Sequence, residues 1–206
     1  SVFGCNSYLH SQQHLHHCGR PVLILGILAS SISGSKAVTN SYESIAKVTV
    51  GSGGASSVEF TSIASTWTHL QLRVYALPNG QQNFGLQFNS DTGSNYSKHM
   101  LQGTGATVGA YGSSSQTAAD YLGLFSDSSS YPAVSVIDIL DYANTNKYKT
   151  IRALTGQDGN GTGTATDWRL TFGSGLWMNT NAITSIKTVN VNFRNYSHIA
   201  LYGIKA

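Results

Sequence analysis

The N-terminal segment combines thiols and imidazoles, the side chains that most often bind zinc in proteins. Cys5 and Cys18 are the two cysteines of the 206-residue chain, and the histidines between them include His14, His16 and His17. Twelve residues separate the cysteines, so no C-x-x-C pair forms half of a zinc site. A disulfide that closes a small loop, or a polar leader with free thiols, fits this spacing better. The sequence therefore predicts no bound metal and no cofactor.

Carboxylates, which acid–base catalysis needs, are scarce, with seven Asp and two Glu in the chain. Asp138 and Asp141 lie three positions apart in a predicted strand, on opposite faces, which argues against the carboxylate pair of a glycosidase. No G-x-S-x-G nucleophile elbow occurs. The segment 158–162 resembles the first half of a calcium loop, but the position of the bidentate Glu is taken by Arg169, which favours a glycine-rich hairpin tip. We therefore expect the protein not to be an enzyme.

Tyrosine is frequent, with 11 copies. Tyr96, Tyr111, Tyr121 and Tyr131 flank polar loops, where rigid aromatic side chains are suited to contact a glycan or a receptor. These four residues are the candidates for a binding surface. The alternative is that most tyrosines bury their rings at the rim of the fold and leave the hydroxyl in water.

Composition restricts the fold that must position these residues. Charged residues make up only 10% of the chain, against about 25% in a typical domain, and apolar residues make up 40%. The shortage of charged helix formers argues against an all-α protein, while the apolar content is enough for one core. The net charge is +3 with basic residues scattered singly, so no nucleic-acid partner is expected. A surface with few ions is also cheap to bury between subunits.

Short apolar–polar alternations separated by Gly, Ser, Asn and Asp predict about eleven strands. The clearest are His69–Ala76, with Leu70, Leu72, Val74 and Ala76 on one face, and Asn83–Asn89, with Phe84, Leu86 and Phe88 on one face. The turn 78–80 between them predicts a hairpin. The other predicted strands are Ser44–Val50, Ser57–Phe60, Lys98–Gln102, Tyr121–Phe125, Ala133–Tyr142, Tyr148–Leu154, Asp167–Phe172, Ile183–Val189 and His198–Lys205.

This pattern favours an all-β fold, a single antiparallel β-sandwich of jelly-roll type, in residues 38–206. Gly103–Ser115 is interpreted as a low-complexity connection. Residues 1–37 are expected to form an N-terminal arm. Its apolar run Val22–Ala29 is much shorter than the roughly 20 residues of a membrane helix, and a buried strand or docking segment is favoured over a targeting signal. No membrane association is expected.

From residue 22 onward the sequence resembles a family of small β-sandwich virion proteins of tailed bacteriophages. The resemblance is carried, in order, by Leu25–Ser33, Ser41–Ala46, Thr49–Gly54, Val58–Ile63, Thr68–Arg73, Gln87–Tyr96, Ala182–Ile186 and Ala200–Lys205. The His- and Cys-containing residues 1–21 depart from it. The family offers no catalytic motif to transfer.

The resemblance implies a non-enzymatic structural protein of the virion. A tail-fibre or tail-tip component that contacts the host surface is the first expectation. A capsid decoration protein held by residues 1–37 is the second, and a secreted carbohydrate-binding module or glycan-cleaving enzyme is a different class left open. The expected partners are copies of the chain itself, a trimer by analogy, other virion proteins and, for a tail fibre, a host-surface glycan.

Overall fold

Twelve strands form within residues 41–159 and 169–205, the part of the chain that the computed structural model describes. These ranges contain no helix, and they belong to a compact unit spanning Asn40–Ala206. The predicted arm, residues 1–37, lies outside them. The strands are β1 (Tyr42–Thr49), β2 (Glu59–Phe60), β3 (His69–Ala76), β4 (Gln82–Phe88), β5 (Tyr96–Gly103), β6 (Val108–Gln116), β7 (Ala119–Phe125), β8 (Ala133–Leu140), β9 (Lys149–Gln157), β10 (Arg169–Trp177), β11 (Ile186–Val189) and β12 (His198–Ile204).

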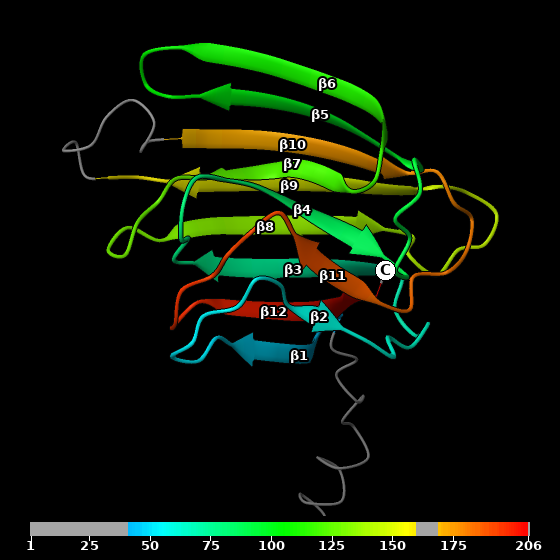
Figure 1. Cartoon of the computed structure of the whole chain (residues 1–206). Coiled ribbons are helices and arrows are strands. Elements are labelled where there is room, and N and C mark those ends of the chain that lie inside the picture. The colour runs from blue at the N-terminus through cyan, green and yellow to red at the C-terminus, as the bar shows by residue number, and fades with distance from the viewer. Residues whose placement is uncertain (1–40, 160–168, 206) are drawn as a thin grey trace, which may run out of the picture. The chain divides into compact units, whose positions relative to one another are not determined.

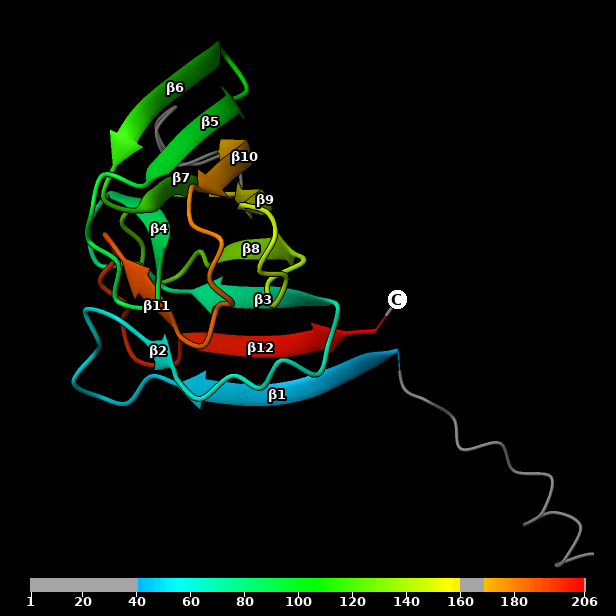
Figure 2. The same cartoon turned by 90° about the vertical axis from the view of Figure 1, so that its right-hand side faces the viewer.

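The strands form two antiparallel sheets, which confirms the prediction of an antiparallel β-sandwich. The larger sheet has eight strands in the order β1-β12-β3-β8-β9-β10-β5-β6, and the smaller has four in the order β2-β11-β4-β7 (Figure 1). Figure 2 shows the small sheet on one side of the large sheet, with β5 and β6 extending past it at the top of the view.

The pairing follows a nested order. β1 pairs with β12, β2 with β11, β3 with β8, and β4 with β7, as in a long hairpin folded over on itself. Two hairpins, β5–β6 and β9–β10, are inserted into this scheme, and both extend the large sheet beyond β8. The large sheet is therefore twice as wide as the small one.

The hairpin predicted at the turn 78–80 is wrong, because β3 and β4 lie in different sheets. The turn crosses from one sheet to the other and is held by the segment before β12. Asn79 N–H donates to the carbonyl oxygen of Asn192 over 2.9 Å, and Pro78 forms an isolated bridge with Phe193.

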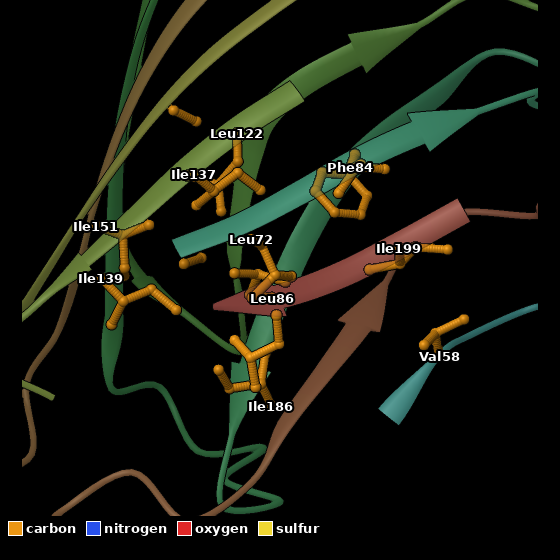
Figure 3. Packing of buried hydrophobic residues seen from close by; sticks show 14 of the residues in the cluster. Val58, Leu72, Phe84, Leu86, Leu122, Ile137, Ile139, Ile151, Ile186 and Ile199 are labelled. Carbon is orange, nitrogen blue, oxygen red and sulfur yellow. The ribbon is translucent and has the colours of Figure 1, made fainter. Parts of the chain in front are cut away.

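The core lies between the two sheets. Leu70, Leu72, Val74 and Ala76 of β3 and Phe84, Leu86 and Phe88 of β4 are all at most 1% exposed, which confirms the predicted inward faces. In Figure 3, Leu72 and Ile199 from the large sheet lie among Leu86 and Ile186 from the small sheet. Burying each such side chain contributes about 1.5–3 kcal/mol, so this interface provides most of the driving force for folding.

β6 was not expected, since Gly103–Ser115 reads as a connection. Its sequence lacks an apolar face because β6 is an edge strand with seven of its nine residues exposed. Backbone pairing with β5, rather than burial of its side chains, keeps this segment in the strand conformation. The register with β5 shifts between Ser113 and Gln116, where Ser115 adopts a φ of 56°.

β7 has a bulge where it pairs with β4 in the small sheet, and its backbone also lies close to β10 of the large sheet. Within the bulge Tyr121 adopts a φ of 58°, in the left-handed region. A Cβ atom on Gly85 would lie 2.6 Å from the Cα of Asp120, and one on Gly173 would lie 2.8 Å from the carbonyl oxygen of Tyr121. Glycine is required at both positions because the opposing atoms belong to the backbone and cannot turn away.

Replacing Gly173 by Ala is therefore expected to lower the free energy of unfolding by about 1–3 kcal/mol, since β7 must move or the strands must separate. The matched control is Gly156→Ala on neighbouring β9, where a Cβ would meet nothing within 4 Å. That control should change stability by less than about 0.5 kcal/mol. Urea unfolding of the two variants measures the difference, and equal losses would refute the close approach.

Candidate functional site

The face of the large sheet that points away from the small sheet carries a band of apolar side chains. Because side chains alternate along a strand, residues between the buried positions of β5, β8, β9 and β10 project from this outer face. One row is fixed by register: Leu101 of β5 opposes Phe172 of β10, which opposes Leu154 of β9, which opposes Val136 of β8. Leu101, Phe172 and Leu154 are 56%, 51% and 52% exposed.

A second apolar row lies beside the first. Leu170 and Val134, exposed by 60% and 49%, both oppose Gly156 from the two sides, so their side chains face one another across a residue that has none. We refer to the two rows together as the outer apolar band: Leu101, Val134, Val136, Leu154, Leu170 and Phe172. A contiguous apolar patch of this kind marks an interaction surface far more often than scattered apolar residues do.

A shallow hollow opens in the band where β10, β5 and β6 meet. Its walls are formed by His99, Leu101, Ala110, Gly112, Phe172 and Ser174. The missing side chain at Gly112 and the small one at Ala110 leave space beside the Leu101 and Phe172 side chains. The hollow is therefore lined mainly by carbon and is suited to receive an apolar side chain.

The other half of the outer face, over β3, β12 and β1, has a different chemistry. The Tyr42 and Tyr202 rings stack with centroids 4.9 Å apart, and the Arg73 guanidinium carbon lies 5.3 and 5.4 Å from their centroids. The Tyr42 hydroxyl donates to Gln71 over 2.5 Å. The polar groups of Tyr42, Arg73 and Gln71 thus interact with one another. This half of the outer face lies next to the apolar band but does not belong to it.

Tyr111 and Tyr121, two of the four predicted contact tyrosines, do lie together. Their ring centroids are 6.3 Å apart with an interplanar angle of 20°, and Tyr111 is 53% exposed. Lys98 Nζ lies 4.1 Å from the Tyr121 centroid and 2.6 Å from Asp120 Oδ1. Tyr111 opposes the buried Met100, so this pair lies on the side of the β5–β6 hairpin opposite to the outer apolar band.

Tyr131, the third candidate, lies in the connection between β7 and β8 and is 38% exposed. Its N–H donates to the Ser128 hydroxyl over 2.7 Å, and its carbonyl accepts from the Gln157 amide over 3.0 Å. The residue is therefore partly exposed but held by a different loop from the Tyr111–Tyr121 pair.

The prediction that Tyr96 contributes to a contact surface is wrong, because its side chain is fully buried. Tyr96 begins β5 opposite Trp177, and its ring centroid lies 6.2 Å from that of Phe88 and 6.4 Å from that of Trp177. Its hydroxyl accepts from Phe88 N–H over 3.0 Å and donates to the carbonyl of Asp91 over 3.2 Å. Burial raises the pKa of Tyr96 to about 12, so the hydroxyl remains a donor.

Asp91 organises the same loop between β4 and β5. Its carboxylate accepts from the Trp177 indole N–H over 2.7 Å, from the Asn95 amide over 2.9 Å and from Gly93 N–H over 2.9 Å. Burial on its own raises the pKa of Asp91, but these three hydrogen bonds outweigh it and hold the pKa below its usual 3.8.

Asp138 and Asp141, the carboxylates whose spacing argued against a catalytic pair, have different partners. Asp138 lies on β8 and accepts from Gln71 over 2.8 Å. The prediction that Asp141 lies in the same strand is wrong, because β8 ends at Leu140 and Asp141 turns the chain with a φ of 50° and pairs with Lys147 over 2.6 Å. The weak zinc candidates lie outside the described residues, as does most of the calcium-like loop: Cys5, Cys18, His14, His16, His17 and residues 160–168. Within residues 41–159 and 169–205 no three His, Cys, Asp or Glu side chains gather as a metal site, and no helix could cross a membrane.

No protein-family model, curated protein or solved structure matches the chain. No relative therefore indicates a role for the outer apolar band, and its role is inferred from its side chains alone. Sequence patterns did not indicate this band, although β10 contains its signal. Leu170 and Phe172 alternate there with Thr171 and Gly173, which ordinarily means that the apolar pair is buried. In the structure the small residues face the core and the large ones face outward.

Replacing Asp91 by Asn is expected to lower the free energy of unfolding at neutral pH by about 1–2 kcal/mol, since charge-assisted hydrogen bonds become neutral ones. Because its pKa is depressed in the folded state, the contribution of Asp91 is present above the unfolded pKa near 3.8 and is lost as the pH falls through the folded pKa. The difference between wild type and variant should therefore shrink on acidification.

Urea unfolding at about pH 7 and about pH 2.5 measures this change. Glu59→Gln, an acid-to-amide change at an exposed position of β2, is the control and should not alter stability at neutral pH. A difference between wild type and Asp91→Asn that is the same at both pH values would contradict the assigned role.

Proposed function

We propose that this chain is a non-enzymatic structural subunit of a tailed-phage virion and that it assembles with copies of itself through the outer apolar band. The band is the observation that carries the assembly: aliphatic and aromatic side chains, five of the six 49–60% exposed, in adjacent rows across β5, β8, β9 and β10. The virion setting is supported by the resemblance of residues 22–206 to phage structural proteins.

The surroundings of the band favour a second copy as its partner. At its border, Arg152 of β9 opposes the oppositely charged Asp138 of β8, and Arg73 of β3, which opposes Val136, lies over the Tyr42 and Tyr202 rings. Typical interfaces place such polar groups at the rim and apolar groups at the centre. An apolar centre is compatible with a second copy of itself, since apolar side chains need no oppositely charged partner.

For the fold, we propose the jelly roll as the finer description. Without β5–β6 and β9–β10, eight strands remain in two four-stranded sheets, β1-β12-β3-β8 and β2-β11-β4-β7. Their nested pairing is what results when one long antiparallel hairpin is wrapped into two facing sheets. Capsid and lectin domains are built in this way, but a fold does not by itself assign a function.

By analogy, a trimeric tail-fibre or tail-tip component is the first candidate, and a capsid decoration protein is the alternative. A glycan contact is a second candidate activity, favoured by the Tyr111–Tyr121 pair on the β5–β6 hairpin. In purified particles, a fibre would follow the tail in a few copies, whereas a decorator would follow emptied heads in numbers set by the capsid symmetry.

The double variant Leu154→Lys, Phe172→Lys is expected to weaken self-association at least about 100-fold, because it places charges at the centre of the band. Sedimentation velocity over a concentration series measures this, and circular dichroism confirms that the fold is retained. The matched control is Tyr148→Lys, since Tyr148 is 52% exposed but lies between β8 and β9, away from the band. A wild-type chain that stays monomeric at about 100 μM would refute self-assembly through the band.

A further inference from the structure

The two sheets present four edges, and three of them carry features that prevent pairing with another strand. β1 has a bulge between Ser44 and Ala46 and the charged residues Glu43 and Lys47. β2 is only two residues long, and β7 is bulged. Bulges, charges and short length are the usual means by which proteins block edge-to-edge association.

The fourth edge, β6, has none of these protections over most of its length. It is nine residues long and contains neither a charged residue nor proline. Its register with β5 is regular from Val108 to Ser113, and the shift occurs only beyond Ser113. Both faces of β6 are open as well, since seven of its nine residues are exposed. The strand therefore offers a long, flat and neutral edge to a partner.

The closing turn of the hairpin shows which backbone groups face that edge. Thr104 N–H donates to the carbonyl oxygen of Thr107 over 3.0 Å, so this pair is hydrogen-bonded. Hydrogen-bonded and non-bonded pairs alternate along an antiparallel ladder. The backbone N–H and C=O groups of Val108, Ala110 and Gly112 therefore point away from β5 and toward the open edge.

We propose that β6 pairs antiparallel with β6 of a second copy, forming a twofold contact in which the two large sheets become continuous. A second copy fits because the strand is free of charge, so two identical strands meet without like-charge repulsion, and an antiparallel pair of identical strands closes on itself. Ala110 opposes Leu101, so the contact would also join the apolar faces of the two molecules.

This contact goes beyond the proposed function, since it uses backbone groups of an edge and not the outer apolar band. The two predictions can therefore fail separately. Ala110→Pro removes one outward N–H without removing a bond to β5, and edge strands tolerate proline. Ala110→Val keeps the N–H and is the matched control. Val108→Lys, at a side chain 86% exposed, adds like charges across the contact without touching the rest of the molecule.

Sedimentation is run on wild type, Ala110→Pro, Val108→Lys, Ala110→Val and the Leu154→Lys, Phe172→Lys variant. We expect Ala110→Pro and Val108→Lys to weaken one association step at least about tenfold, and Ala110→Val to leave it unchanged. The band variant should still form dimers through β6, and combining it with Ala110→Pro should give monomers.

Amide hydrogen exchange of the wild-type chain at low and high concentration tests the edge without any substitution. The N–H groups of Val108, Ala110 and Gly112 should exchange at least about tenfold more slowly at high concentration. If they exchange freely at every concentration, or if Ala110→Pro associates like wild type, the edge contact is refuted, whatever the band variant does. Loss of association in the band variant alone would then leave only the outer apolar band as an interface.

Discussion

The close approach of β7 to the strands beneath it is the constraint on which the arrangement of the outer surface depends. The β7 backbone lies so near β10 that Gly173 admits no side chain, and the Cβ of an alanine at Gly123 would lie 2.8 Å from the Thr155 hydroxyl of β9. The inner faces of β9 and β10 therefore take small residues at this point. Their large apolar side chains at this point, Leu154, Leu170 and Phe172, lie on the outer face instead, where they form part of the apolar band.

The same approach determines where the tyrosine pair sits. The bulge that brings β7 toward the large sheet holds Tyr121 in the left-handed region and places Asp120 against Lys98 of β5. Residues in such conformations persist only where the surrounding structure holds them. Here the Lys98 ammonium, between the Asp120 carboxylate and the Tyr121 ring, links β7 to the β5–β6 hairpin. The hairpin is thus held on its inner side by an ion pair as well as by its ladder with β10.

Sequence patterns were sufficient for the strands whose two faces differ in polarity. In β3 and β4 the apolar set is buried and alternation identifies it, so the strands and the all-β fold could be predicted. The partner of each strand could not be read from a turn: the segment at Pro78 connects two sheets, although its residues are typical of a hairpin. Alternation does not show which face of a strand is buried, so the alternating residues of β10 did not reveal that its large apolar side chains lie outside. Tyr96 was misplaced because its polar neighbours conceal that the Asp91 loop covers it.

Most residues of the outer apolar band, and the unprotected edge, lie on the two hairpins inserted into the nested scheme. Four of the six residues of the outer apolar band lie on β5, β9 and β10, and the unprotected edge is β6. The outward side chains of β1, β3 and β12 instead form the Arg73–Tyr42–Tyr202 group, which satisfies itself. The inserted hairpins also extend the core, since Tyr96, Ile151 and Trp177 on their inner faces are buried together with side chains of the nested strands. The other face of these hairpins points away from the small sheet, and there β10 exposes Leu170 and Phe172, while the edge strand β6 carries no charge.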